Sequence, residues 1–98
     1  MKFILTGPFT DNIYNVMRAI GYHFQRQEPG SSELAFTRPR IGYPRLHLFV
    51  KVEGGNYLCT LHLDQKKPAY LGTHAHSGEY DGTVIENEVK RITGLIAR

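Results

Sequence analysis

Two runs in the middle of the chain alternate apolar and polar residues: Arg45-Leu46-His47-Leu48-Phe49-Val50-Lys51-Val52 and Tyr57-Leu58-Cys59-Thr60-Leu61-His62-Leu63-Asp64. The segment Glu53-Gly54-Gly55-Asn56 separates them. Adjacent glycines between two alternating runs are typical of a two-residue β-hairpin turn, because both turn residues need positive φ angles. We therefore predict an antiparallel hairpin with Gly54-Gly55 as its turn, in which Val52 faces Tyr57 and the pairing continues to Arg45 and Asp64.

This register gives the hairpin one apolar and one mixed face. The apolar face, which we expect in the core, contains Leu46, Leu48, Val50, Val52, Tyr57, Cys59, Leu61 and Leu63. The opposite face pairs His47 with His62, Arg45 with Asp64, Phe49 with Thr60 and Lys51 with Leu58. A shift of one residue would exchange the two faces. Every functional prediction below therefore depends on the hairpin register.

The region before the hairpin predicts a strand, a helix and two further strands. The apolar segment 3–6 predicts a strand that ends at Gly7-Pro8. Apolar residues then recur at helical spacing, with Thr10 or Asp11 as the N-cap and Gly21 as the C-terminal stop. This stripe consists of Ile13, Val16, Met17 and Ile20. Segments 22–24 and 34–37 predict the two strands that follow.

The region after the hairpin predicts a second helix. Its apolar stripe consists of Val84 or Ile85, Val89, Ile92 and Ile96. Thr83 and Glu86 match a capping box, with Asp81 as a rival cap. The connection 65–80 has no long periodic pattern, although 69–71 could be a short strand. We expect 78–82, with a glycine at each end, to form a loop that leads into the helix.

These elements predict an α+β fold for residues 1–98 as a single domain. The order β-α-β-β-β-β-α suggests a two-layer sandwich in which an antiparallel sheet of four to five strands carries two helices on one face. This order resembles the TATA-binding-protein-like arrangement in topology alone, and no family motif accompanies it. The other face of the sheet should therefore be exposed.

Composition excludes several classes of protein. An apolar content of 41% with 21% charged residues argues against disorder. One cysteine excludes an internal disulfide framework, and no apolar run approaches the roughly 20 residues of a membrane span. We expect a cytoplasmic binding domain that makes no use of a membrane. The net charge of +3 and the pI of about 9.2 permit an acidic partner.

Nucleic acid is one predicted partner of the exposed sheet face. Arginine pairs well with phosphates, and aromatic rings stack on unpaired bases. The residues predicted to form this surface are Arg38, Arg40, Tyr43, Arg45, Phe49 and Lys51. A protein partner, including a second copy of the chain, is the other prediction, because Phe49 and Leu58 are apolar residues on the face that should meet solvent.

A metal site is the alternative function. Four histidines fall between positions 47 and 76, and His47 and His62 face each other in the predicted register. Zinc is bound by imidazole and carboxylate groups, and an open coordination position activates water. The candidate ligands are His47, His62, His74, His76 and Glu79. With Glu79 as a base instead of a ligand, this set would suit a metal-dependent hydrolase.

Overall fold

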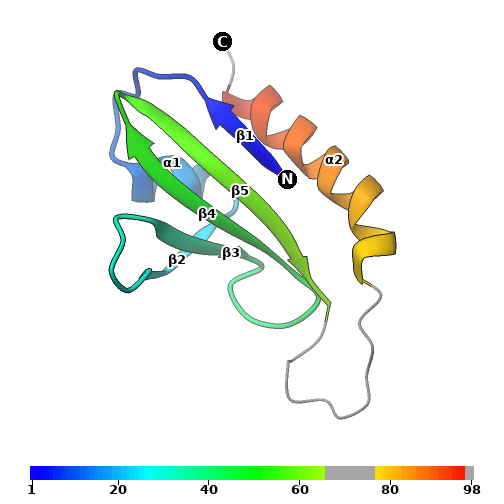
Figure 1. Cartoon of the computed structure of the whole chain (residues 1–98). Coiled ribbons are helices and arrows are strands. Elements are labelled where there is room, and N and C mark those ends of the chain that lie inside the picture. Colours follow the sequence, from blue (N-terminus) through cyan, green and yellow to red (C-terminus); the bar gives the residue numbers. More distant parts are fainter. Residues whose placement is uncertain (66–76, 97–98) are drawn as a thin grey trace.

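A five-stranded antiparallel sheet carries both helices on one of its faces (Figure 1). The structure is a computed structural model that describes residues 1–65 and 77–96, except for the side chains of residues 77–81. Along the chain the elements are β1 (Lys2–Leu5), α1 (Ile13–Ala19), β2 (His23–Gln27), β3 (Leu34–Arg38), β4 (Arg45–Glu53), β5 (Asn56–Asp64) and α2 (Ser77–Ile96). The strands lie in the order β1-β5-β4-β3-β2. The predicted α+β class and the element order are both confirmed.

The β4–β5 hairpin has the predicted register over its whole length. Val52 faces Tyr57, His47 faces His62 and Arg45 faces Asp64. Gly54 and Gly55 have φ angles of 59° and 82°, which are the positive values that a two-residue hairpin turn needs. Side chains on a strand alternate between the faces of a sheet. The register therefore decides which hairpin residues meet the helices and which lie on the opposite face.

The core lies between the apolar face of the sheet and the two helices. Met17 from α1 and Ile92 from α2 are fully buried there, as are Phe36 from β3 and Leu48 from β4. Val52 departs from the predicted core, because it lies on this face next to the turn and is 50% exposed. Neither helix, over the residues described, is long and apolar enough to cross a membrane.

Helix α1 has a different N-cap from the two predicted, Thr10 and Asp11, and begins one residue later than a cap at Asp11 would give. The N-cap is Asn12, whose Oδ1 accepts a hydrogen bond from the backbone N–H of Asn15 at 2.9 Å. Asp11 instead accepts from the N–H of Asn12 at 2.7 Å. The predicted stop at Gly21 is confirmed, since this residue has a φ of 98° and donates its N–H to the carbonyl oxygen of Arg18 at 3.0 Å.

Helix α2 begins earlier than predicted. It starts at Ser77, so the prediction of a loop over 78–82 is wrong. A glycine inside a helix costs only about 1 kcal/mol relative to alanine, so a pair of glycines does not by itself end a helix that packs on a sheet. The short strand predicted at 69–71 lies outside the described residues.

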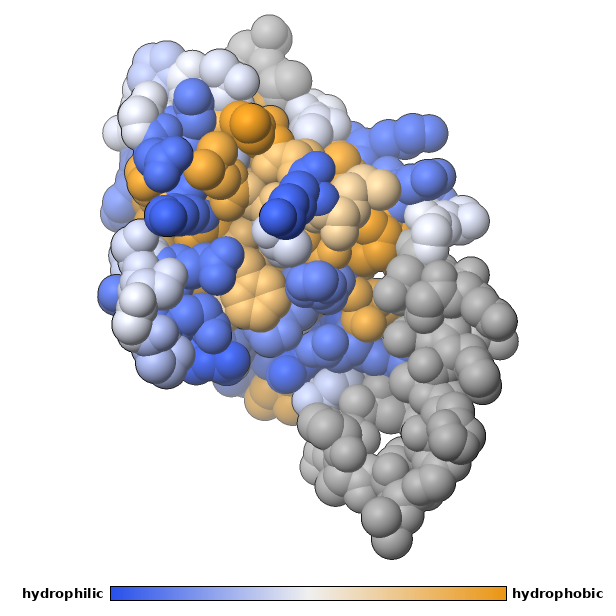
Figure 2. Space-filling view, viewed as in Figure 1, coloured by the Kyte–Doolittle hydropathy of each residue, from blue (hydrophilic) through white to orange (hydrophobic). Residues whose placement is uncertain are grey.

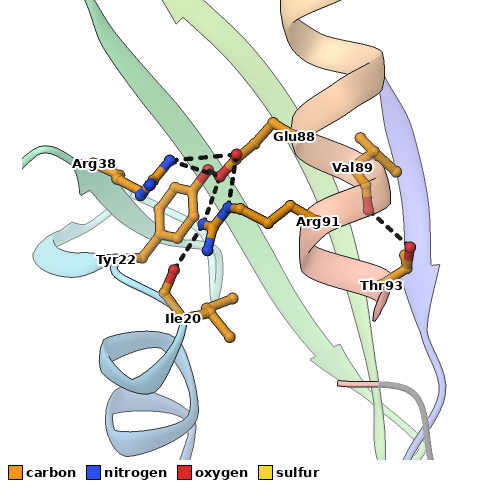
Figure 3. Close-up of polar contacts among 7 residues, drawn as sticks. All are labelled: Ile20, Tyr22, Arg38, Glu88, Val89, Arg91 and Thr93. Atoms are coloured by element: carbon orange, nitrogen blue, oxygen red, sulfur yellow. Dashed lines mark hydrogen bonds and ion pairs between the residues drawn. The ribbon is translucent and has the colours of Figure 1, made fainter. Parts of the chain in front are cut away.

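A buried ionic cluster joins α2 to the sheet and to the end of α1 (Figure 3). The carboxylate of Glu88 accepts hydrogen bonds from the hydroxyl of Tyr22 at 2.7 Å and from two nitrogens of Arg91 at 2.7 and 2.9 Å. Arg38, at the end of β3, reaches the same carboxylate at 3.3 Å. Arg91 also donates to the backbone carbonyl of Ile20 at 2.7 Å. The cluster therefore connects α1, β3 and α2 around a side chain that is only 6% exposed.

Candidate functional site

The face of the sheet opposite the helices, here called the outer face, is the candidate site. In Figure 1 helix α1 lies behind the strands, so the view is onto this face. Figure 2 shows apolar side chains gathered over the middle of the molecule, with hydrophilic side chains around them. The outer face carries the alternate residues of each strand, as the confirmed register requires.

One rung of the outer face crosses all five strands. Strand pairing aligns Arg26 of β2 with Ala35 of β3, then Phe49 of β4, Thr60 of β5 and Lys2 of β1. Small side chains thus flank the central phenylalanine, and a cation stands at each edge. Since neighbouring strands lie about 4.8 Å apart, each cation is anchored on the order of 10 Å from Phe49.

Three rings form the centre of this face. The rings of His47 and Phe49 are stacked, with centroids 4.4 Å apart and planes inclined by 29°. The ring of His62 meets Phe49 edge-on, with centroids 5.8 Å apart and planes inclined by 72°. Phe49 is partly buried and His62 is exposed. These two rings therefore form an aromatic surface that faces solvent, and the ring of His47 packs against Phe49.

His47 is buried, although it lies on the face expected to be exposed. It faces Thr37 on one side and His62 on the other, and the residue is 9% exposed. Its Nδ1 lies 3.2 Å from Oδ2 of Asp64, and Nε of Arg45 donates to the same oxygen at 3.3 Å. Burial lowers the pKa of His47 below 6.5, although the carboxylate of Asp64 acts in the opposite direction.

The neutral form of His47 therefore predominates at neutral pH. In this form the N–H at Nδ1 donates a hydrogen bond to Asp64, and Nε2 carries no hydrogen and is an acceptor. Nε2 is buried and has no hydrogen-bond partner among the described residues. Protonation would place a second N–H at this atom without an acceptor. The arrangement suits a ring that orients Phe49, and the buried nitrogen is not accessible to a ligand on the surface.

The structure brings together some of the predicted basic residues and separates others. The guanidinium of Arg45 lies 4.6 Å from the centre of the Tyr43 ring, while Arg40 is exposed in the loop between β3 and β4. Lys51 is exposed on the outer face opposite Leu58. Arg38, by contrast, pairs with Glu88 in the buried cluster on the helix side. Arg38 therefore does not belong to the outer face.

Sequence reasoning missed two outer-face cations, Lys2 and Arg26. The alternation of Lys2 with Phe3 was a signal that the lysine lies opposite the core. However, the sequence did not show that β1 pairs with β5 or that β2 pairs with β3. Arg26 lies at an irregularity in the β2–β3 pairing, which changes the alternation locally, and its guanidinium pairs with Glu28 at 3.1 Å.

The predicted metal site is not assembled by the residues whose side chains are described. Among them, no group of three or more histidine, cysteine, aspartate or glutamate residues could hold a metal ion. His74 and His76 lie outside the described residues, and Glu79 lies in α2 within the part whose side chains are not described. Zinc binding therefore stays a prediction.

Comparisons with known proteins do not assign the chain to a family. No protein-family model matches it, no curated protein matches it, and no solved structure matches it.

Proposed function

We propose that the domain binds single-stranded nucleic acid on the outer face of its sheet. The observation that carries this proposal is the rung in which Phe49 stands between Lys2 and Arg26 on an open five-stranded sheet. Sheets that bind single strands combine aromatic rings, on which bases stack, with cations that reach the phosphates. The mildly basic composition agrees with such a partner.

Charge on the outer face supports the proposal. Lys2 and Lys51 form no ion pair with any described residue, so both ammonium groups are available to phosphates within that part of the chain. Arg45 is stacked on Tyr43 and paired with Asp64, which fixes the guanidinium at the end of the hairpin. A strand that crosses the sheet past Phe49 would meet Lys2 on one side of the ring and, on the other, Arg26, whose guanidinium also contacts Glu28.

Fluorescence anisotropy with labelled 12-mers of RNA and DNA, measured over a range of salt concentrations, tests the proposal. We expect affinity to fall with salt, because phosphate contacts release counterions. Phe49→Ala should weaken binding by about 1–3 kcal/mol, the contribution of one stacked base. Lys51→Ala should reduce the slope of log affinity against log salt by about 0.7, the contribution of one phosphate contact with a single strand.

The matched control is Lys90→Ala. This exposed lysine lies on α2, so the variant removes the same charge from the helix layer and should leave the salt slope unchanged. Failure of both oligonucleotides to bind, or equal binding by wild type and Phe49→Ala, would exclude the proposal. In that case the exposed Ile4, which faces Leu58 on the same face, favours a protein partner instead.

A further inference from the structure

A cleft of about 640 Å³ lies on the helix side of the molecule. It is bounded by the β1–α1 loop, by α1 and by the C-terminal end of α2, and Figure 1 shows the loop and this end of α2 at the same end of the molecule. Small-molecule sites typically have volumes of roughly 300–1,000 Å³. None of the outer-face residues lines the cleft, so an inference from it is independent of the proposed function.

Two walls of the cleft are apolar. Val16 and Ile20 line it from α1, and Leu95 and Ile96 line it from α2. Leu95 is 53% exposed, which is high for a large apolar side chain beside the core. A hydrocarbon group seated in the cleft would cover the apolar surface that remains exposed here, chiefly that of Leu95, since Ile20 is already buried. The gain is about 25 cal/mol per Å² of apolar surface.

The remaining part of the cleft is polar and carries one charge. Among the described residues that line the cleft Asp11 alone is charged, and Thr10 and Asn15 lie beside it in the lining. Its Oδ1 accepts hydrogen bonds from the backbone N–H of Asn12 at 2.7 Å and from the side chain of Asn15 at 3.0 Å. Oδ2 has no hydrogen-bond partner among the described residues. The two hydrogen bonds, first that from Asn15, lower the pKa of Asp11, so the carboxylate is ionised at neutral pH.

The loop wall is held in place before any ligand arrives. The N–H of Gly7 donates to Oδ1 of Asn56 at 2.9 Å, and the ring of Phe9 stacks on Tyr57 with centroids 4.0 Å apart and planes inclined by 4°. Both contacts attach the loop to the turn end of the hairpin. A wall that is already ordered reduces the entropy that binding would otherwise lose.

We propose that this cleft binds a small organic cation with an apolar body, such as an alkylammonium group. The ammonium lies against Oδ2 of Asp11, and the hydrocarbon lies between α1 and the end of α2. Charge complementarity selects the cation, because the described residues of the lining include a single carboxylate and no basic side chain. An anionic ligand of the same shape would meet repulsion from Asp11.

Chemical-shift titrations of the ¹⁵N-labelled full chain with matched probes test this inference. Hexylammonium should bind roughly two- to fivefold more tightly than 1-hexanol, as expected for one exposed ion pair. Hexanoate should bind more weakly than either. Butylammonium should lose about fourfold in affinity for each methylene removed. Shifts should centre on Val16, Ile20 and Leu95.

Two variants separate the charge from the cavity. Asp11→Asn should bring hexylammonium to the affinity of hexanol and leave hexanol unchanged, while Glu86→Gln, an exposed acid of α2 outside the cleft, should change neither. Ala19→Leu fills the cleft and should abolish binding of all probes. The spectra themselves report whether each variant folds. Absence of saturable shifts at the cleft, hexanoate binding as tightly as hexylammonium, or an unchanged preference in Asp11→Asn would each overturn the inference.

Discussion

Replacement of Glu88 by glutamine tests whether the buried ionic cluster holds α2 on the sheet. The variant keeps the shape of the side chain and removes its charge, which leaves two guanidinium groups without their carboxylate. Removal of one partner from a buried ion pair costs about 3–5 kcal/mol. The side chains of Arg91 and Arg38 are 31% and 40% exposed, so water compensates part of that loss. We therefore expect a loss of about 2–3 kcal/mol.

Urea denaturation followed by circular dichroism at pH 7 measures this loss. For a domain of this size the same change corresponds to a fall in Tm on the order of 10–20 °C. Tyr22→Phe removes one hydrogen bond and keeps both ion pairs, so it should lose about 1 kcal/mol. Glu86→Gln, on an exposed position of the same helix, should stay within about 0.5 kcal/mol of wild type.

Acid titration supplies an independent readout of the same cluster. Burial raises the pKa of Glu88, but the hydrogen bonds from Arg91 and Tyr22 and the charges of Arg91 and Arg38 outweigh it, so the pKa lies below 4.5. A depressed pKa stabilises the fold above the pKa of the unfolded chain, and this stabilisation is lost as the pH falls through the folded value. Glu88→Gln should lack that acid-dependent component. A variant that is as stable as Glu86→Gln at pH 7 would refute the role of the cluster.

Four further outcomes are expected. Gly7→Ala should lower the free energy of unfolding in urea by about 1–3 kcal/mol or more, because an added Cβ would lie 1.9 Å from the carbonyl oxygen of Gly55. Gly94→Ala has open space around its Cβ and should instead raise that free energy by up to about 1 kcal/mol. The lowered pKa of His47 predicts stability that is complete above pH 6.5 and lost as the pH falls toward the folded pKa, and His47→Gln should lack this loss in pH-dependent melting curves. If the predicted zinc site exists, elemental analysis of the purified full chain should find stoichiometric zinc that His62→Ala removes; metal-free wild type would exclude it.

The hairpin register could be read from the sequence because its determinants are local. Two adjacent glycines define the turn, and the alternation of the two runs then decides which residues face each other. The start of α2 could not be read in this way. Glycine weakens a helix by a small local amount, whereas packing of the following turns on the sheet determines whether the helix extends through it.

The outer face was harder to predict, because its composition depends on pairing between distant strands. The sequence placed Phe49 and His62 on this face, since both belong to the hairpin. It did not bring Lys2 and Arg26 to the same rung, because that needs the order of all five strands. The burial of His47 has the same cause: Thr37 from β3 faces it and Phe49 stacks on it.

The sequence contains one indication of the buried cluster, which is the position of Glu88 within the apolar stripe of α2. Glu88 lies three residues after Ile85 and four residues before Ile92, so helical periodicity places it on the face of α2 that meets the core. A carboxylate at such a position needs partners. One partner, Arg91, is local, because it lies three residues further along α2. The other two, Tyr22 and Arg38, come from segments 50 or more residues away, and no local pattern identifies them.

Charge is distributed differently on the two faces, and this difference supports a division between stability and binding. On the helix side Arg38 and Arg91 share the carboxylate of Glu88. On the outer face Lys2 and Lys51 have no ion pair with any described residue and stand around exposed aromatic surface. On the outer face Arg26 and Arg45 are likewise paired, with Glu28 and Asp64, so the charge that remains for the proposed nucleic acid is that of Lys2 and Lys51.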